Sequence, residues 1–459
     1  MDKTEKQLID FASTLKYGDL PPAAVHAAKA RFVDSLGVAL AAIDAPTVKA
    51  ARKLVVPVKS GARARLFGSL ETVPPETAAF VNGAMVRYLD MNDAYTRAST
   101  AHASDNIPAL LAVAEAVGAS GRDLILATVI CYEIHCRICD AVPFFARGWD
   151  QSLAATPALA LATARLLRLK PEPMRHALAI AAAESLSTRQ TRAGELSMWK
   201  GLAGPSAARQ GVFAAFAAKA GVTGPQDSYD GKHGIWKQTM DGPQRISIPA
   251  SFKRHTFAIG QTNIKIFPVR DGIQVPVRTM MKLREKCDPK AVAKLRIDSY
   301  RHAFERWEPD PAFWNPTTRE TADHSLPFCL AAALLEGDIT PETFLRKRFR
   351  DADIHAMMKK MDLHYDPAFD KVAPGTRSCR LTATLKDGAS VSAEFRQTEK
   401  DMERGLDDAE IEAKFHTLNR RRMPQKARDK LILSLWNLDR LKSVGEVVAL
   451  TKAARTKSR

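Results

Sequence analysis

The sequence predicts a mainly α-helical protein in which both chain ends build a large all-helical domain and an inserted segment forms a smaller α/β domain. Two observations support this fold class. Apolar residues recur with a helical period through about the first 265 residues, and alanine-rich runs there would let helices pack closely. Beyond that point, alternating apolar and polar residues indicate strands. We therefore expect a helical domain at 1–265, a smaller α/β domain at 266–403, and residues 404–459 packing back onto the helical domain.

The helices of the large domain are predicted from apolar periodicity and from the turns between the periodic segments. Near the N-terminus they are expected at residues 8–15, 22–43, 46–55, 76–89, 107–120, 121–142, 152–169 and 171–186. Helices return near the C-terminus at residues 407–421, 424–441 and 443–454.

The smaller domain combines strands with one strongly apolar helix. A strand is expected at 295–300, and a helix begins near Pro327 and ends at Gly337. Residues 377–397 alternate apolar and polar side chains on both sides of a Lys-Asp-Gly turn. This pattern predicts a β-hairpin with a type I′ turn.

The composition is that of a globular protein without a membrane segment. Of the 459 residues, 46% are hydrophobic and 26% are charged, and no apolar run is long enough to cross a bilayer. The N-terminal segment resembles an amphipathic helix and lacks the apolar core of a signal peptide. We expect a cytoplasmic protein that does not bind membranes.

The net charge of +17 indicates an anionic partner or a strongly solvated surface. Part of the charge is local, in the triplet at 420–422 and in four cations within 452–459. The sequence contains no zinc-finger, helix-turn-helix or RNA-recognition signature, so we do not expect nucleic acid as a partner. The charge is better explained by a field that attracts anionic small molecules.

Three cysteines, Cys131, Cys136 and Cys139, have a spacing that superficially resembles iron–sulfur ligation. They lie in an apolar, helix-like run, where cysteine commonly packs as a small hydrophobic residue. A fourth ligand would have to come from a distant segment. We therefore expect buried thiols, and neither a metal nor another cofactor.

Residues 187–209 carry an unusual density of charge next to an alanine-rich helix. Arg189, Arg192 and Lys200 accompany the single carboxylate of Glu195. Charges beside a buried helix are costly unless they are paired or face a ligand. The stretch predicts either a cationic cradle for a polycarboxylate or a surface loop with a salt bridge.

Four segments of the chain stand out as motifs. They are YLDMNDAY with AHASDNIPALLAVAEA, then RQTRAGELSMWKG, QTNIKIFPV and PTTRETADHSLPFCLAAALLEG. Together they resemble the MmgE/PrpD family, which includes 2-methylcitrate dehydratase and cis-aconitate decarboxylase. The first pair is similar to the D-x-N-D and H-P-S-D elements of the family, the second motif to its catalytic-lysine segment and the third to its K-x-F-P segment, and the fourth is a long further match. The motifs follow in the order of the family over nearly the whole chain.

The resemblance implies lyase chemistry on a di- or tricarboxylate, as in propionate metabolism, by a homodimer without an iron–sulfur cluster. Dehydration of 2-methylcitrate or citrate is the expected reaction. Decarboxylation, or isomerisation or epimerisation through a related carbanion-like intermediate, is the alternative within the family. A catalytically inactive homologue that binds a carboxylate is the alternative of another class.

The resemblance also implies a set of site residues. His102 matches the histidine of the H-P-S-D element and is the expected general acid or base, although a histidine that caps the next helix is the plainer interpretation. Asp90 and Asp93 match acidic positions that could orient it, or they are polar residues at a helix end. The remaining expected site residues would bind carboxylates or lie at the domain junction: Lys200, Lys265, Arg189, Arg192, Arg319, Asp323 and His324.

Lys200 has a second possible role. A desolvated lysine could act as the base, because burial lowers the pKa of its ammonium group.

Two histidines of the family are missing from this sequence. Asp150 or Gln151 stands where the decarboxylases have a second catalytic histidine. The related dehydratases carry a histidine a few residues after K-x-F-P, where this chain has Arg270, Asp271 and Gly272. These differences weaken the case for a decarboxylase most, and they leave open which residues take the place of the two histidines.

Overall fold

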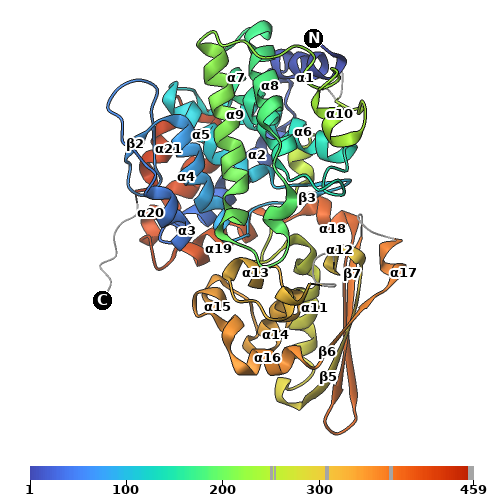
Figure 1. Ribbon diagram of the computed structural model, residues 1–459. Helices are drawn as coiled ribbons and strands as arrows, with labels where there is room; N and C mark the ends of the chain where they lie inside the picture. Colours follow the sequence, from blue (N-terminus) through green and yellow to red (C-terminus); the bar gives the residue numbers. More distant parts are fainter. Residues whose placement is uncertain (249–251, 253–254, 305–309, 372–375, 453–459) are drawn as a thin grey trace.

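The computed structural model describes residues 1–248, 252, 255–304, 310–371 and 376–452. Buried hydrophobic side chains form two large clusters, one from residues 8–264 with 411–448 and one from residues 267–393. The segments that supply the first cluster form a helical part, and those that supply the second form a part with a sheet and shorter helices (Figure 1). The prediction of a mainly α-helical protein with a smaller α/β part is confirmed.

The helical part has α7 and α9 packed side by side near its centre (Figure 1). Proline in the first turn starts several of its helices, where a missing N–H costs nothing. Its helices are α1 (Lys3–Thr14), α2 (Pro22–Ala41), α3 (Pro46–Arg52), α4 (Pro75–Tyr88), α5 (Ile107–Ala116), α6 (Gly121–Ala141), α7 (Ser152–Leu166), α8 (Pro171–Glu184), α9 (Ala203–Lys219) and α10 (Ile235–Met240).

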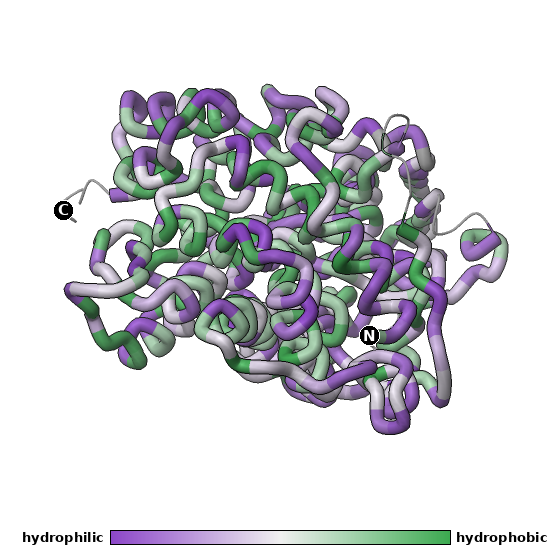
Figure 2. The backbone as a smooth tube through the Cα atoms, turned by 90° about the horizontal axis from the view of Figure 1, so that it is seen from above, coloured by the Kyte–Doolittle hydropathy of each residue, from purple (hydrophilic) through white to green (hydrophobic). Residues whose placement is uncertain are grey.

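Helix α9 was not among the predicted helices, because Gly204, Pro205 and Gly211 interrupt its pattern. All three are buried. A Cβ on Gly211 would lie 2.7 Å from the carbonyl oxygen of Thr156, so the glycine lets α9 approach α7 closely. Seen from above, the more hydrophobic stretches of the tube lie mostly inside and the hydrophilic stretches mostly at the rim (Figure 2).

Two short antiparallel ribbons also lie in the helical part. One pairs β1 (Ala64–Arg65) with β2 (Thr72–Val73), and the other pairs β3 (Tyr95–Thr96) with β4 (Thr100–Ala101). The second ribbon connects the end of α4 to the start of α5. It therefore positions the segment that contains both D-x-N-D and His102.

The smaller part contains a four-stranded sheet in the order β6-β5-β7-β8. β5 (Val292–Ser299) runs parallel to β6 (Met361–Tyr365) and antiparallel to β7 (Arg377–Leu385), which pairs antiparallel with β8 (Ser390–Gln397). Its helices are α11 (Gln274–Arg284), α12 (Arg301–Phe304), α13 (Arg319–Ala322), α14 (Leu326–Glu336), α15 (Pro341–Leu345), α16 (Ala352–Met358) and α17 (Pro367–Asp370). After β8, α18 (Glu399–Arg404) contacts η5 (Ala258–Gln261) of the helical part. Helix α11 packs between the hairpin and α14.

The predicted hairpin is confirmed, but the prediction of a type I′ turn is wrong. A type I′ turn needs positive φ at both central residues. In this turn Gly388 has a φ of 87°, while Asp387 is not among the residues with positive φ. Leu385 pairs with Ala389 through a three-residue loop, which closes with a hydrogen bond from Gly388 N to Leu385 O.

The chain returns to the helical part through α19 (Asp408–Asn419), α20 (Gln425–Trp436) and α21 (Gly445–Leu450). Helix α19 packs on α2, and Phe415 closes over Gly37. The last residues of the helix expected at 443–454, and the cations beyond Lys452, lie outside the described residues. Among the described helices, none is both long and apolar enough to cross a membrane.

Candidate functional site

Asp90 is the centre of a buried charge cluster at the C-terminal end of α4. It is 1% exposed and has a φ of 53°, a left-handed conformation that aspartate adopts more readily than most residues. Arg87 donates to its Oδ1 at 2.6 Å, and Lys265 donates to the same oxygen. Lys200 donates to Oδ2 at 2.8 Å. One cation from the last turn of α4 and two from distant segments therefore converge on one carboxylate.

Lys200 links this carboxylate to the smaller part of the molecule. Its Nζ also lies 3.1 Å from Oδ1 of Asp323, and Asp323 receives a hydrogen bond from Arg319 at 3.0 Å. Burial opposes ionisation of Asp90, but Arg87 and Lys200 outweigh it and hold the pKa of this carboxyl well below its usual range. Burial lowers the pKa of the Lys200 ammonium group although both carboxylates oppose the shift.

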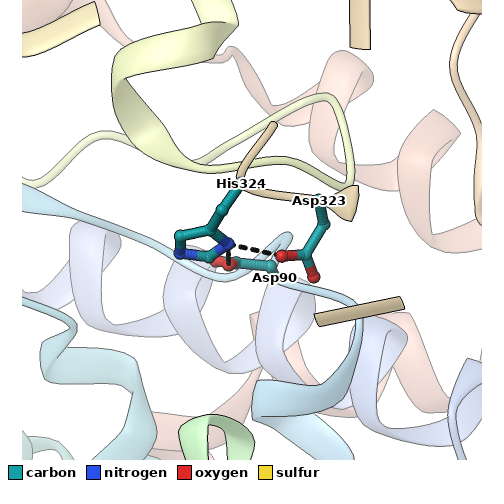
Figure 3. A group of neighbouring side chains, drawn as sticks. All are labelled: Asp90, Asp323 and His324. Atoms are coloured by element: carbon teal, nitrogen blue, oxygen red, sulfur yellow. Dashed lines mark hydrogen bonds and ion pairs between the residues drawn. The ribbon is translucent and has the colours of Figure 1, made fainter. Parts of the chain in front are cut away.

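His324 completes the cluster on the side of Asp323. Its Nδ1 lies 2.5 Å from Oδ1 of Asp323 and 3.8 Å from Oδ2 of Asp90. Figure 3 shows the His324 ring directed at both carboxylates. Burial and the nearby Lys200 lower the pKa of the His324 imidazole well below its usual value. His324 is therefore neutral near pH 7.

Asp90, Asp323 and His324 also bring three possible ligand atoms within 4.8 Å of one another. The two carboxylates already accept hydrogen bonds from Lys200, Lys265, Arg87 and Arg319. A divalent cation would have to displace or face these positive groups, which is electrostatically unfavourable. The residues suit an ion-pair network and do not fit a resident metal ion.

His102 follows β4 and precedes the short helix η2 (Ala103–Asn106). Its Nδ1 lies 2.9 Å from the carbonyl oxygen of Asp93, and its backbone N–H donates to Gln151 Oε1 at 3.2 Å. A carbonyl oxygen only accepts, so Nδ1 carries the ring proton. The His102 side chain makes no capping bond to η2, so the plain alternative of a capping histidine is not what this structure shows.

The electrostatic surroundings keep His102 neutral. Burial, together with Arg87 and Lys265, lowers the pKa of the His102 imidazole well below its usual value. With the proton fixed on Nδ1, Nε2 carries a lone pair. The ring is therefore arranged to accept a proton at Nε2 and not to donate one.

Asp93 holds the His102 ring through its backbone carbonyl and is itself fixed by Ser104. Its Oδ1 accepts hydrogen bonds from Ser104 N at 3.0 Å and from Ser104 Oγ at 2.5 Å, which ties its side chain to η2. Its contribution to His102 comes through its backbone carbonyl. The two aspartates of D-x-N-D thus differ in role, since Asp90 gathers the cations and Asp93 orients the histidine.

A pocket between the two parts of the molecule brings several of these groups to one surface. Phe145 and Thr100 contribute to its wall, and the remaining lining side chains are charged groups and histidines. They are Arg87, Asp90, His102, Arg192, Arg270, Asp271, His302 and His324. Three guanidinium groups accompany two carboxylates, so the pocket carries the positive balance that an anionic ligand needs.

The cradle predicted at 187–209 divides into residues at the pocket and residues away from it. Arg192 lines the pocket and binds Asp150 at 2.7 Å. Arg189 lies 4.5 Å over the ring of Phe145, outside the pocket lining. Lys200 and Lys265 are 1% and 0% exposed, with Nζ directed at carboxylates. Direct binding of a substrate to either lysine would require one of these ion pairs to open.

Arg319 lies at the junction of the two parts. Its guanidinium is 4.2 Å from the centre of the Tyr88 ring, and it reaches the site through Asp323. Of the two placements expected for this segment, Arg319 takes the junction, while Asp323 and His324 belong to the charge cluster.

Sequence reasoning missed several residues of the site. Arg87 lies one position before the YLDMNDAY motif. Its charge at the end of an apolar helix was the sequence feature that could have indicated it as a site residue. His302 carries no signal in the sequence, because only the fold brings α12 to the pocket. Gln151, one of the two residues in a missing histidine's place, binds the His102 backbone and donates to Asp105 at 2.9 Å.

The three closely spaced cysteines behave as small core residues. Cys131, Cys136 and Cys139 are fully buried in α6. Burial raises the pKa of each thiol, so these side chains are protonated at neutral pH. The expectation of buried thiols is confirmed.

The fold and the site define a two-part, mainly helical protein with a pocket lined by arginines, aspartates and histidines. Two family models match the chain, the MmgE/PrpD N-terminal domain over residues 6–246 and the MmgE/PrpD C-terminal domain over residues 267–439. The chain belongs to the MmgE/PrpD family.

Curated relatives cover nearly the whole chain at low identity. A cis-aconitate decarboxylase of Homo sapiens is 25% identical, over 95% of this chain and 92% of the relative. Two proteins named 2-methylcitrate dehydratase are each 26% identical. The one from Salmonella typhimurium covers 84% of this chain and 83% of its own length, and the one from Cupriavidus necator covers 96% and 95%. The relatives are lyases of two kinds at similar distance.

Proposed function

We propose that this chain is a hydro-lyase that removes water from a small hydroxy-polycarboxylate such as 2-methylcitrate or citrate. The observation that carries the proposal is the tautomer of His102. Its Nδ1 proton faces the Asp93 carbonyl oxygen, which leaves the lone pair on Nε2, and the residue lines a pocket with three guanidinium groups. Dehydration begins with removal of a proton from a carbon next to a carboxylate, which requires a base of this kind.

In the proposed reaction, Nε2 of His102 takes the proton from that carbon. The electron pair of the C–H bond forms the double bond as the C–O bond breaks, and the hydroxyl oxygen leaves with its electron pair and is protonated to water. Negative charge grows on the neighbouring carboxylate during proton removal. Arg87, Arg192 and Arg270 line the pocket and would stabilise this charge, as fixed cations do in an oxyanion site.

The charge cluster behind the pocket would keep these groups in place. Asp90 binds Arg87 directly, and Lys200 and Lys265 balance the Asp90 charge. This pairing lets Arg87 remain buried and fixed in orientation before substrate arrives. A preorganised cation stabilises developing charge without a reorganisation cost during the reaction.

A second candidate function is decarboxylation of a tricarboxylate, because relatives of similar identity are named cis-aconitate decarboxylase. Loss of CO₂ leaves a carbanion that must receive a proton, so it calls for a donor in place of a base. The tautomer of His102 favours dehydration.

We further propose a cytoplasmic homodimer that binds small carboxylates and not nucleic acid.

The proposal is tested by incubating the protein with 2-methylcitrate, citrate and cis-aconitate, with absorbance near the enoate band, NMR of the products and measurement of released CO₂. Enoate formation from a hydroxy acid without CO₂ is the expected result. Release of CO₂ from cis-aconitate would select the second candidate, and an unchanged panel would overturn both.

A further inference from the structure

His302 is a pocket side chain to which the proposed reaction has not yet given a role. It lies on α12, is 25% exposed at the side chain, and shares the pocket with His102 and His324. Its Nε2 lies 3.7 Å from Oδ2 of Asp271, a carboxylate that is 3% exposed. A histidine with one nitrogen toward a buried carboxylate and its ring at a pocket is a common arrangement for proton transfer.

Because Gly272 has no side chain, His302 can pack directly against it. A Cβ built on Gly272 would lie 2.4 Å from the carbonyl oxygen of His302 and 3.1 Å from its ring Cδ2. Any side chain at 272 would therefore collide with residue 302. The related dehydratases were expected to carry a histidine within this segment, where the chain has Arg270, Asp271 and Gly272, and the imidazole of His302 lies against Gly272.

Neighbouring groups hold this segment in a fixed orientation. Arg270 donates to the carbonyl oxygen of His302 at 2.9 Å, and Tyr300 donates its hydroxyl proton to the carbonyl oxygen of Gly272 at 2.9 Å. The rings of Tyr300 and His302 stack with centroids 6.5 Å apart. His302 is therefore placed by interactions with both sides of the Gly272 turn.

Asp271 is itself fixed as a carboxylate. Arg377 binds its Oδ2 at 2.8 Å, and Thr96 of the β3–β4 ribbon donates to the same oxygen at 3.2 Å. Burial opposes its ionisation, but Arg377 and His302 hold the pKa of Asp271 well below its usual range. Asp271 therefore presents a negatively charged carboxylate to Nε2 of His302.

We propose that His302, backed by Asp271, is the general acid that protonates the departing hydroxyl group. The inference rests on the proposed dehydration. His102 gains the proton from carbon, and His302 gives its proton to the leaving oxygen, which departs as water with the electron pair of the broken C–O bond. Return of one proton from His102 to solvent and uptake of one by His302 restores both residues.

The test compares His302→Gln, His302→Ala and a matched control, His364→Gln. His364 lies on β6 in the same part of the molecule and pairs with Asp362 at 2.9 Å, but at the surface and away from the pocket. Turnover of the substrate identified in the panel is measured with and without added imidazole. We expect kcat of His302→Gln to fall by about 10²- to 10⁴-fold with KM changed less than about threefold. Imidazole should restore part of the activity of His302→Ala, and His364→Gln should match wild type.

A second measurement keeps the inference testable apart from the overall activity. Histidine-selective NMR of the wild-type protein, assigned by the missing signal of His302→Gln, follows each imidazole during titration with citrate. We expect the His302 signal to shift and the His364 signal to stay. A folded His302→Gln with wild-type kcat, or a His302 signal unmoved by saturating citrate, would overturn the inference. A wild-type protein that converts none of the panel would overturn the proposed function, and the NMR titration would then decide whether His302 faces the bound anion.

Discussion

Lys200 and Asp90 form an ion pair of 2.8 Å in which both side chains are almost completely enclosed. The pair joins η4 (Met198–Gly201) to the end of α4, and the second carboxylate on Lys200, Asp323, comes from the smaller part of the molecule. The ammonium group of Lys200 therefore links the helical part to the smaller part through two ion pairs. The positions of the pocket residues depend on this network as well as on their own side chains.

Replacing Lys200 with methionine should lower the free energy of unfolding much more than replacing an exposed lysine does. The substitution keeps the side-chain volume but leaves Asp90 and Asp323 with less compensating charge in a buried place. We expect a loss of about 3–5 kcal/mol in the free energy of unfolding, the usual cost of breaking one side of a buried pair. Urea unfolding measures it, with the exposed Lys219→Met as control. A loss below about 1 kcal/mol would show that the network does not hold the two parts together.

Acid should weaken the fold between pH 7 and 5 through histidines that are buried and neutral. His135 in α6 is fully buried, and burial lowers its pKa to about 3. In the unfolded chain its pKa is near 6.5, so below that pH the unfolded state binds more protons and is favoured. His135 alone should cost about 2 kcal/mol of stability between pH 7 and pH 5.

A variant without His135 separates the contribution of this residue to the pH dependence of stability from that of the other buried histidines. His102 and His324 also have lowered pKa values and contribute with the same sign, so the wild-type slope is the sum of several groups. Urea unfolding at pH 7, 6 and 5 of wild type and of His135→Gln gives the difference. A slope in the variant equal to that of wild type would contradict the assignment.

Gly272→Ala should disturb the pocket although it adds one methyl group. The new Cβ would meet the His302 carbonyl oxygen at 2.4 Å, so the segment around residue 302 must move. We expect destabilisation of about 1–3 kcal/mol, as for overpacking, and a fall in activity. Gly260→Ala is the control, because nothing lies within 4 Å of a Cβ there. Equal behaviour of the two variants in thermal unfolding and turnover would show that position 272 tolerates a side chain.

Local sequence patterns were sufficient to predict the class of fold. The apolar period predicted most long helices, and the alternation around Lys386-Asp387-Gly388 predicted the hairpin. The turn type was wrong because the Asp-Gly pair is compatible with more than one loop, and the choice depends on how the flanking strands close. Helix α9 was missed because buried glycines, which serve its close packing, look like helix breakers in the sequence.

The sequence indicated some of the residues that meet in the charge cluster and the pocket, but not the contacts between them. Motif resemblance indicated His102, Asp90, Lys200 and Lys265, yet it could not show that both lysines face Asp90. Lys414 of α19 shows why. It donates to Asp34 at 2.6 Å and to the carbonyl oxygens of Met91 and Lys265 at 2.7 and 2.8 Å, from a segment with no motif. Such contacts depend on long-range packing, which local patterns do not encode.

The measurement that tests the account most directly is the rate of enoate formation by His102→Gln compared with wild type on the substrate identified in the panel. Glutamine keeps the size and polarity of the side chain but cannot accept the proton from carbon. We predict a fall in kcat of about 10²- to 10⁴-fold with KM changed less than about threefold and with unchanged folding by circular dichroism. A folded His102→Gln that forms the enoate at the wild-type rate would contradict the assignment of His102 as the base.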